Sequence, residues 1–419
     1  MESALRYALS MLRRGSLIVG ATFVFAVPAA LGQWTVTNLH PAGATYSRAL
    51  GVSGFQQVGH ATIDGQPHAS LWTGSAQSWI DLNPPGAVRS ECWDVDRGRQ
   101  VGSVQIETGM NRAALWSSTR DSYVDLHPST SEVSVAWGID GETQAGSAGP
   151  RQIGLRAVTW TGTAQSAVDH HPPAVPPPHL VRQSEFFGIR DGHAVGYWFG
   201  MSPRPFRGTM LTEAGLLDIT PDWGADPGSV SCNVDSSSRG QHVGYAEVLF
   251  GPRKAILWTG LSATPVDLTP PNRISAWAQG VWRGQQVGYV NASNGAPRAA
   301  LWNGSAESWI DLHTFVPPNY TSSTARAIWS DRFQTFAAGW ATNASTGRTE
   351  ALMWSRASCW ADLTHNEVVD DEDFSPFAIA YDDLICPAKL CPADLNDDGV
   401  VDDADFQLFV AAYDALLCP

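Results

Sequence analysis

Residues 57–86 read QVGHATIDGQPHASLWTGSAQSWIDLNPPG, and this pattern returns along most of the 419-residue chain. Close copies start at Gln100, His242 and Gln286, and weaker copies start at Ala145, Val195 and Ala338. The Val-Gly or Ala-Gly marks fall at positions 58, 101, 145, 195, 243, 287 and 338, so the period is 43 to 51 residues. A period of this length indicates an array or ring of small repeated units.

Each unit contains short runs rich in Val, Trp and Leu, bounded by Gly, Pro, Asn and Ser, which are strand signals. The order is a strand at Val-Gly, a strand ending in Leu-Trp, a strand ending in Asp-Leu, and a last strand before the next Val-Gly. Four short strands in each of seven units predict an all-β fold, a seven-bladed β-propeller. A parallel β-helix would have a much shorter period, and a β-sandwich would not repeat so regularly.

The first repeat begins out of phase. Residues 34–59, WTVTNLHPAGATYSRALGVSGFQQVG, match the second half of a unit, whereas the unit from Ala338 supplies only a first half. We therefore expect the amino-terminal strand to complete the last blade and close the ring, which leaves fewer exposed sheet edges.

Two residue types recur in fixed slots of the repeat. A tryptophan slot favours a core between blades, and the alternative is an exposed platform on which sugars stack; the slot holds Trp72, Trp116, Trp160, Trp258, Trp302 and Trp354. Tryptophans outside the slot, which suit a platform better, are Trp198, Trp223, Trp277, Trp282 and Trp329. An aspartate slot favours carboxylates that accept backbone N–H bonds in a turn, and the alternative is a ring of cation or sugar ligands. Its members are Asp81, Asp125, Asp169, Asp218, Asp267 and Asp311.

An active site normally breaks the symmetry of repeats, so the irregular units matter most. Residues 170–179 read HHPPAVPPPH, which is either a solvated loop or a metal-binding one. Residues 186–208 read FFGIRDGHAVGYWFGMSPRPFRG, which is either a ligand groove or an irregular blade. Gly-x-Ser-x-Gly, His-Glu-x-x-His, P-loop and sialidase Asp-box motifs are absent from the sequence. The catalytic residues, if the protein has any, therefore stay unknown.

Residues 1–32 predict a signal peptide. Arg6, Arg13 and Arg14 precede the apolar run LIVGATFVFAV, and small residues suit cleavage after Gly32; an uncleaved anchor is the alternative. The apolar run is short for a membrane span, and no later stretch reaches 18 apolar residues, so we expect no span in the mature chain. The expected location is extracellular, with attachment at the cell surface left open.

The formal net charge of −15 is concentrated at the carboxyl end. The last 59 residues carry thirteen Asp and two Glu against one Lys, so the remaining chain is close to neutral. A nucleic-acid partner requires a basic face, and the body does not offer one.

The carboxyl end concentrates oxygen ligands in the stretch CPADLNDDGVVDDADFQLF, residues 391–409. Ca²⁺ takes six to eight oxygens, which a twelve-residue loop supplies at alternating positions around a sharp glycine turn. Gly399 is suited to that turn, and the predicted ligands are Asp394, Asn396, Asp398, the Val400 carbonyl, Asp402 and Asp405. Aromatic and aliphatic residues at helical spacing follow the loop and predict a helix.

A similar loop stands 32 residues earlier. Its corresponding positions are Asp362, Thr364, Asn366, the Val368 carbonyl, Asp370 and Asp373. Glu367 replaces the glycine and Thr364 is a poor ligand, so we expect weaker calcium binding here.

Six cysteines are present, and export favours disulfides over metal ligands. Cys359 to Cys386 and Cys391 to Cys418 are both separated by 27 residues, so these pairs are the predicted disulfides, although other pairings stay open. The sequence assigns no role to Cys92 or Cys232.

Two resemblances follow from these motifs. His68-Ala69-Ser70-Leu71-Trp72, Asp81-Leu82 and Gln100-Val101-Gly102 are similar to the extracellular HAF repeat, over about residues 34–358. The paired loop–helix end resembles a type I dockerin. This resemblance implies calcium binding and a cohesin-like partner, recognised through loop positions ten and eleven, here Asp371-Glu372 and Asp403-Ala404. We expect these two helices to form the interface, through Asp403, Ala404 and partly exposed Phe409 and Tyr413 rings.

The sequence thus predicts a signal peptide (1–32), a seven-bladed propeller (33–358) and a small helical calcium module (359–419). The favoured function is a secreted, non-enzymatic binding or structural propeller that a calcium-dependent tail holds to an extracellular partner or assembly. Polysaccharide is a candidate ligand of the propeller. The alternative is a polysaccharide-active hydrolase or lyase, since dockerin-like tails commonly accompany such enzymes.

Overall fold

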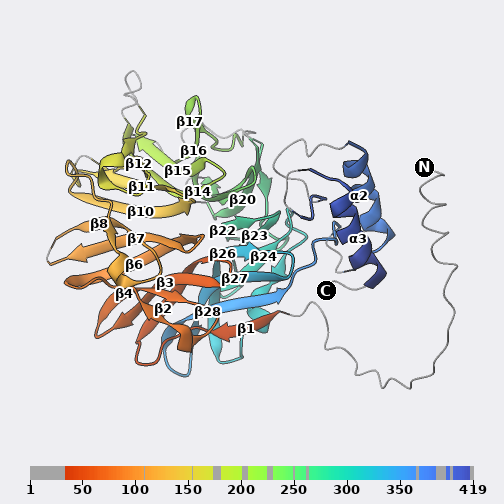
Figure 1. The fold of residues 1–419 in the computed structure, drawn as a ribbon, viewed down its shortest axis with the longest axis horizontal. Helices are drawn as coiled ribbons and strands as arrows, with labels where there is room; N and C mark the ends of the chain where they lie inside the picture. Colours follow the sequence, from red (N-terminus) through yellow and green to blue (C-terminus); the bar gives the residue numbers. More distant parts are fainter. Residues whose placement is uncertain are drawn as a thin grey trace. The chain divides into compact units, whose positions relative to one another are not determined.

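Seven four-stranded antiparallel sheets follow one another along the chain, as the repeats predict (Figure 1). The computed structural model describes residues 34–107, 109–152, 154–172, 181–200, 206–223, 230–248, 251–260, 264–364, 368–383, 393–396 and 400–415. The first four sheets are β2–β5 (Tyr46–Ser53, Gln56–Ile63, Gln66–Trp72, Ile80–Asp81), β6–β9 (Ala87–Asp96, Arg99–Ile106, Asn111–Trp116, Val124–Asp125), β10–β13 (Val133–Asp140, Thr143–Gly149, Arg156–Trp160, Val168–Asp169) and β14–β17 (Val181–Arg190, His193–Gly200, Arg207–Thr212, Gly215–Asp218). Next come β18–β21 (Val230–Ser238, Gln241–Val248, Lys254–Thr259, Val266–Asp267) and β22–β25 (Ala276–Trp282, Gln285–Asn291, Pro297–Trp302, Ile310–Asp311).

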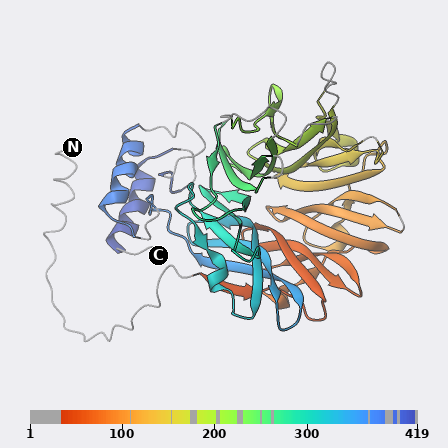
Figure 2. The same cartoon turned by 180° about the vertical axis from the view of Figure 1, so that it is seen from behind.

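The seventh sheet joins the two ends of the propeller. It contains β26 (Tyr320–Ser330), β27 (Gln334–Asn343), β28 (Arg348–Ala357) and the first strand, β1 (Thr35–Asn38). Thr35 lies opposite Ser355, and Asn38 lies opposite Leu352, in the antiparallel pair of β1 with β28. In both views the red first strands lie beside the blue ones (Figures 1 and 2).

The helical elements are few. Short 3₁₀ turns occur at η1 (Ala76–Ser78), η2 (Arg120–Ser122), η3 (Ala164–Ser166) and η4 (Leu312–Phe315). Two helices, α2 (Asp371–Asp383) and α3 (Asp403–Ala415), follow the propeller. Among the described residues, no helix is both long and apolar enough to cross a membrane.

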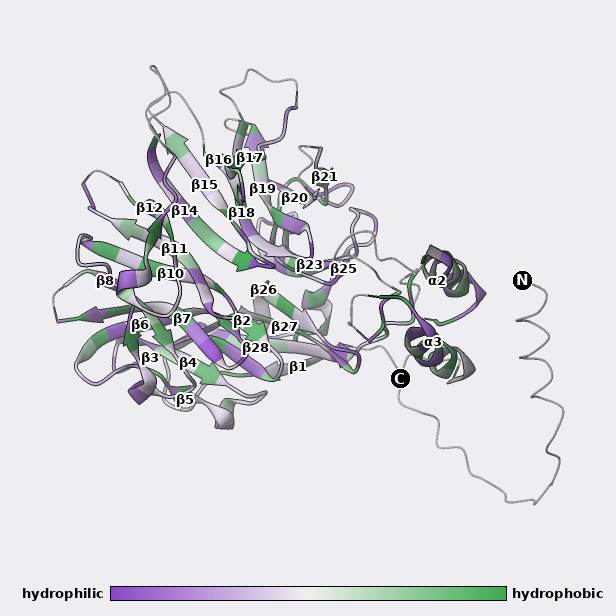
Figure 3. Ribbon diagram, turned by 45° about the horizontal axis from the view of Figure 1, so that its top comes forward, coloured by the Kyte–Doolittle hydropathy of each residue, from purple (hydrophilic) through white to green (hydrophobic). Residues whose placement is uncertain are grey.

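The repeated tryptophans form the core between blades. All six have fully buried side chains, and each packs with aliphatic residues from neighbouring strands. In the fourth blade the same slot holds Leu211, because Met210 pairs with Val195 one residue earlier. Hydrophobic segments accordingly run along the strands (Figure 3). The core interpretation of this slot fits the structure, and a sugar platform does not.

Steric crowding explains why glycine occupies the second position of each Val-Gly or Ala-Gly mark. In all seven blades this glycine lies on the second strand, and a Cβ there would collide with a carbonyl of the paired innermost strand. For Gly102 that carbonyl belongs to Glu91, and for Gly244 it belongs to Asn233. The repeat marker therefore records the closest approach of two backbones in each blade.

Candidate functional site

The repeated aspartates are held in the turns by backbone donors. In each, one carboxylate oxygen accepts the N–H of the residue two positions later, at 2.8–3.1 Å. The other oxygen faces a histidine, lysine or arginine side chain of the third strand, for example His68 for Asp81 and Arg298 for Asp311. These contacts fit the turn interpretation and leave little for a ring of external ligands.

Beside these aspartates, a buried serine hydroxyl forms hydrogen bonds that connect two successive blades; this contact is called the serine latch. Ser134 accepts a bond from the Ala113 N–H of the previous blade at 2.8 Å, and its hydroxyl lies 2.7 Å from His127 Nδ1. His127 Nε2 lies 2.9 Å from the Ser131 carbonyl, so Nε2 carries the proton and Nδ1 accepts from Ser134. Equivalent latches hold Ser47, Ser184 and Ser323.

The two histidines of the third unit take part in the same contacts. His171 occupies the latch position and lies 2.8 Å from Ser184. His170 Nε2 lies 2.8 Å from the Thr159 hydroxyl. His179 lies outside the described residues. Latch bonding accounts for His171 without a metal.

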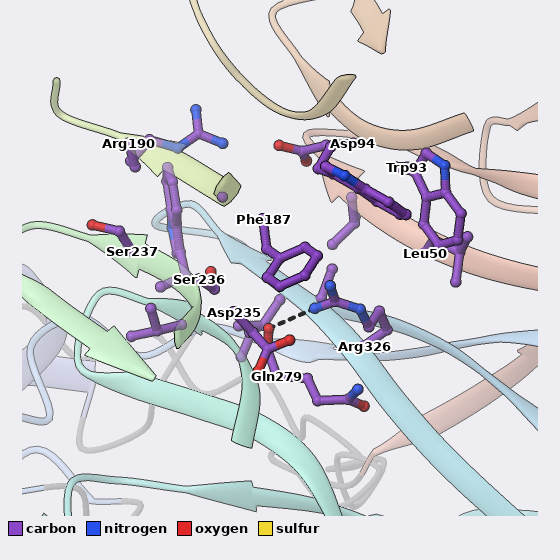
Figure 4. A pocket seen from close by; sticks show the side chains of 18 of the residues that line it. Leu50, Trp93, Asp94, Phe187, Arg190, Asp235, Ser236, Ser237, Gln279 and Arg326 are labelled. Atoms are coloured by element: carbon purple, nitrogen blue, oxygen red, sulfur yellow. Dashed lines mark hydrogen bonds between the residues drawn. The ribbon is translucent and has the colours of Figure 1, made fainter. Parts of the chain in front are cut away.

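A cavity of about 60 Å³ lies on the propeller axis, lined by the innermost strands of all seven blades (Figure 4). Each innermost strand carries a β-bulge near its middle, and the bulged side chain points into this cavity. The seven bulged residues are Leu50, Trp93, Trp137, Phe187, Asp235, Gln279 and Arg326. The repeat symmetry is therefore broken on the axis, at one position per blade.

One side of the axial cavity is aromatic. The Trp93 and Trp137 rings lie 4.5 Å apart, and Phe187 packs against Trp137 at 5.6 Å between ring centroids. These rings fill much of the channel. The remaining space is too small for a sugar ring, although it can hold ordered water.

The other side of the cavity is polar and charged. Asp235 accepts a 2.7 Å bond from Trp277 Nε1. Arg326 donates a 2.7 Å bond to the Gln279 carbonyl (Figure 4). Burial raises the pKa of Asp235 to about 6, against the opposing charge of Arg326. Burial likewise raises the pKa of Asp94 to about 6, although the Arg190 guanidinium favours its ionised form.

A larger, open groove lies between blades two, three and four, at the end where their innermost strands begin. Its volume is about 410 Å³. Its polar lining comprises two arginines and three carboxamides, Arg89, Arg151, Gln105, Asn111 and Gln183. Met110, Val133 and Leu155 supply apolar surface.

Two inter-strand loops form the walls of this groove. Residue 154 of the β11–β12 loop is glycine with φ +114°, and a Cβ there would collide with the Arg182 carbonyl of β14. The neighbouring Leu155 carbonyl accepts a 3.0 Å bond from Ser184 N–H, so this loop is attached to β14. Across the groove, Arg151 Nη1 lies 4.0 Å from Met110 Sδ in the β7–β8 loop.

The floor of the groove lies beside Glu185, whose carboxylate is engaged in hydrogen bonds within the protein. Glu185 accepts bonds from Tyr197 OH at 2.8 Å, Ser147 Oγ at 2.9 Å and Gln183 Nε2. These bonds fix the Gln183 side chain that lines the groove.

The two predicted calcium loops are partly within the described residues. Asn366, Asp398 and the Gly399 turn lie outside them. At loop position twelve, Asp405 is fully buried and accepts N–H bonds from Leu395 and Asn396 at 2.7 and 3.0 Å and from Asp402 at 3.0 Å. Asp373, at the same position of the first loop, is also fully buried and accepts from Thr364 and Asp370 N–H groups.

Both loops also bury a second carboxylate. Asp394 and Asp362, at position one of each loop, are buried. Buried carboxylates in pairs fit a cation, because burying like charges without compensation is costly. Among the described residues, no group of three or more His, Cys, Asp or Glu is assembled as a metal site.

The two helices of the tail are joined by reciprocal contacts. Tyr381 of α2 donates to Asp403 at the start of α3, and Tyr413 of α3 donates to Asp371 at the start of α2 at 2.6 Å. Ala404 N–H donates to Asp402 at 2.8 Å. The expectation that Phe409 is partly exposed is wrong: it is 1% exposed, because it stacks on Phe377 at 4.7 Å.

Exposed apolar rings of the tail are found elsewhere. Phe374 and Phe406, each one turn before the buried phenylalanine of its helix, are exposed, as is Ile379. Phe374 and Phe406 lie at helical spacing with the buried Phe377 and Phe409, so their exposure shows that each helix buries only a narrow stripe.

The cysteines divide into two groups. Cys92 and Cys232 are free and buried, and both belong to blade cores. Cys359 packs at the edge of the tail core. Cys386, Cys391 and Cys418 lie outside the described residues, so the disulfide pairing stays a prediction.

Sequence reasoning missed the axial ring and the groove. The signal for the ring was present: the bulged residue directly precedes a glycine in RALGV and in FFGIR, and it varies from unit to unit while its neighbours repeat. The groove had no such signal, because its residues come from seven separate segments.

The described residues between 34 and 357 thus form a seven-bladed β-propeller with an axial cavity and an open groove. No family model matches the sequence, and no curated protein matches it. Several solved structures are similar in fold. The β-propeller domain of the Trilobed protease from Pyrococcus furiosus is 8% identical, with a TM-score of 0.47, over 75% of this chain and 97% of that one.

Two further structures are similarly distant. An oligogalacturonate lyase from Vibrio parahaemolyticus is 10% identical, with a TM-score of 0.44, over 76% of this chain and 93% of that one. A puromycin hydrolase is 12% identical, with a TM-score of 0.46, over 74% of this chain. The chain spans about half the length of the puromycin hydrolase, 53%. Likeness at this level concerns the fold and not the function.

Proposed function

We propose that this protein is an exported, non-enzymatic binding propeller that a calcium-dependent, dockerin-like tail holds to an extracellular partner or assembly. The observation that carries the proposal is the open groove of about 410 Å³, which is built from unlike residues of three blades. A purely structural propeller has no need for such a site, and its volume falls within the range of ~300–1,000 Å³ typical of ligand pockets.

The axial cavity supports a binding role less well than the groove does. At about 60 Å³ it admits no sugar, and its aromatic rings pack against one another. The repeated aspartates are engaged in turns. The groove is therefore the part of the propeller best suited to a ligand.

Export rests on the sequence of residues 1–32, and tethering rests on the tail. Asp394, Asn396, Asp398, Asp402, Asp405 and the Val400 carbonyl would hold calcium in the second loop. The weaker set in the first loop is Asp362, Thr364, Asn366, Asp370, Asp373 and the Val368 carbonyl. Bound calcium would neutralise these carboxylates and stiffen the loops. The cohesin-like partner would contact loop positions ten and eleven together with exposed Phe374, Phe406 and Ile379.

One observation favours the alternative of a polysaccharide-active enzyme. Asp94 and Asp235 line the same cavity, and each has a pKa of about 6, which suits proton transfer near neutral pH. However, Asp94 already accepts N–H bonds from Val95 and Ile139, at 2.8 and 3.0 Å, so it is held as a structural acceptor. The cavity that both carboxyl groups line, of about 60 Å³, also admits no sugar ring.

The full chain, with calcium present, tests the proposal against a panel of plant, algal and microbial polysaccharides. Retention on a polymer and newly released reducing or unsaturated ends are recorded together. We expect retention without release. Turnover of any polymer would establish the enzyme instead, and the same experiment with Asp94→Asn and Asp235→Asn would show whether the axial carboxylates are responsible.

A further inference from the structure

We propose that the groove between blades two, three and four recognises an acidic glycan, specifically a uronic acid chain that it binds through its carboxylates. The inference rests on the proposed function, because it names the ligand class of the same binding propeller. The juxtaposition that carries it is two arginines and three carboxamides around one open cavity.

The charge of the groove sets the sign of the ligand. Its lining includes Arg89 and Arg151 and no acidic residue. The Arg89 guanidinium lies 3.7 Å from the Glu91 carboxylate, which is longer than a hydrogen bond. Arg89 is therefore available to a ligand anion.

Arg151 is positioned to close on a ligand. Its backbone N–H donates to Glu132 at 3.1 Å, which anchors the β11–β12 loop, while its guanidinium extends to Met110 on the opposite wall. Within the described part of the chain, the Arg151 guanidinium contacts the Met110 thioether, which is a weak acceptor. A ligand carboxylate would replace this contact with a stronger, charge-assisted one. The guanidinium fork fits a carboxylate in two parallel bonds.

The carboxamides favour a sugar over a simple anion. Gln105 and Asn111 each offer a donor and an acceptor, as vicinal hydroxyl groups require. Gln183 offers its carbonyl oxygen as an acceptor, because its amide nitrogen already donates to Glu185 and Tyr197. Gln183 is pre-positioned by Glu185 and Tyr197, so its orientation costs little on binding. The apolar surface of Val133 and Leu155 suits the C–H face of a pyranose ring.

The test uses the full chain and two probes that differ at the carboxyl groups: tri-galacturonate and its fully methyl-esterified form, in which each negative charge is replaced by a methyl ester. Calorimetry should show that the acid binds at least about tenfold more tightly than the ester, because each charge-assisted bond contributes ~1.5–3 kcal/mol. Raising the salt concentration from 0.05 to 0.5 M should weaken the binding of the acid and leave the binding of the ester unchanged.

Substitutions then locate the site. Arg89→Gln and Arg151→Gln should each reduce affinity for the acid about tenfold, and Arg151→Lys should restore only part of it, because lysine lacks the fork. Arg120→Gln, at an exposed position in η2, is the matched control and should have no effect. A sulfated trisaccharide of equal charge should bind more weakly than the uronate.

Each other outcome contradicts the inference in a distinct way. Equal affinity for acid and ester would exclude recognition of charge, and tighter binding of the sulfated probe would exclude carboxylate as the preferred group. Unchanged affinity in both arginine variants would place the acidic ligand elsewhere. If tri-galacturonate does not bind, the inference about the groove is wrong. Retention on a neutral polymer would then still support the proposal of a binding propeller. Absence of binding to every polymer would contradict both the inference and the proposed function.

Discussion

Ser134 shows how one hydroxyl connects two blades of the propeller. It accepts the Ala113 N–H from one blade and donates to His127 in the connecting loop, and it is fully buried. A hydroxyl in such a position satisfies two groups that have no access to water. The repeat keeps serine in this slot in five of seven blades, at 47, 90, 134, 184 and 323.

We predict that Ser134→Ala destabilises the protein by about 1–3 kcal/mol, because the Ala113 N–H then loses its buried acceptor. Denaturant unfolding followed by tryptophan fluorescence measures the change. Ser129→Ala, at an exposed site in the loop that contains His127, should change the free energy of unfolding by no more than about 0.5 kcal/mol. An equal effect of both variants would show that the latch contributes no stability.

His60 gives a prediction about pH. Burial, together with the nearby Arg48 and Arg89 charges, lowers its pKa to about 4. Between pH 6.5 and 4 the unfolded chain therefore binds more protons at this site than the folded chain, so stability is present above pH 6.5 and falls as the pH falls.

His60→Gln should reduce the loss of unfolding free energy that occurs as the pH falls. The wild type should lose on the order of 2–3 kcal/mol more than the variant between pH 7 and pH 4. Asp94 and Asp235 titrate in the same window with the opposite sign, but they are common to both proteins and cancel in the difference. Urea unfolding at several pH values measures the two slopes; parallel slopes would mean that His60 accepts a proton in the folded state.

At the scale of the element, each innermost strand combines positions that pack between blades with one bulged position whose residue differs from blade to blade. Residues on either side of the bulge pack between blades or, like Asp94, line the cavity beside the bulged residue, and the bulged residue itself faces the axis. Glycine often follows the bulge; at Gly51 and Gly188 a Cβ would press on the next innermost strand, on the backbone of Asp94 and Asp235 respectively. The bulged side chains are thereby free to vary without disturbing the blades.

The loop–helix element of the tail depends on the aspartate at loop position twelve. Asp405 joins the beginning and the end of its loop through three N–H bonds. We predict that Asp405→Ala lowers calcium affinity by about tenfold or more and reduces helix content. Calorimetry on the full chain and circular dichroism at 222 nm measure both, since the described helices other than short 3₁₀ turns belong to the tail.

Asp382→Ala removes the same charge from an exposed position in α2 and serves as the control. It should leave calcium binding unchanged. Comparable losses in both variants would indicate a general charge effect rather than ligation, and no loss in either would contradict calcium binding by the second loop.

At the scale of the whole molecule, the repeat sequence predicted the number of blades, the core tryptophans and the engaged aspartates. These depend on local patterns that recur, so seven copies reinforce one interpretation. The axial ring could not be foreseen, because a bulge depends on the pairing register of Ala49 and Gly51 and not on composition. Phe409 was assigned the wrong exposure, because helical spacing does not show which side of a helix meets its partner.

The first and last strands depend on each other across the whole chain. Trp34 and Val36 pack into the core formed by β24, β26 and β28, and Arg356 lies over the Trp34 ring at 4.9 Å. Asn38 donates a 2.8 Å bond to buried Glu350. Removing β1 would expose the backbone edge of β28 as well as these groups.

We therefore predict that deleting residues up to Asn38 destabilises the propeller by at least about 3–5 kcal/mol, the cost of losing one buried tryptophan. Thermal unfolding should shift downward, and hydrogen exchange should accelerate in β28 and β27 before the other blades. Thr35→Ala, which removes an exposed bond to Ser355, should change little. A synthetic peptide of residues 34–40 added in trans should recover part of the loss. Uniform exchange across all blades, with no rescue by the peptide, would mean that the seventh sheet is stable without β1 and that the ring does not depend on joining its two ends.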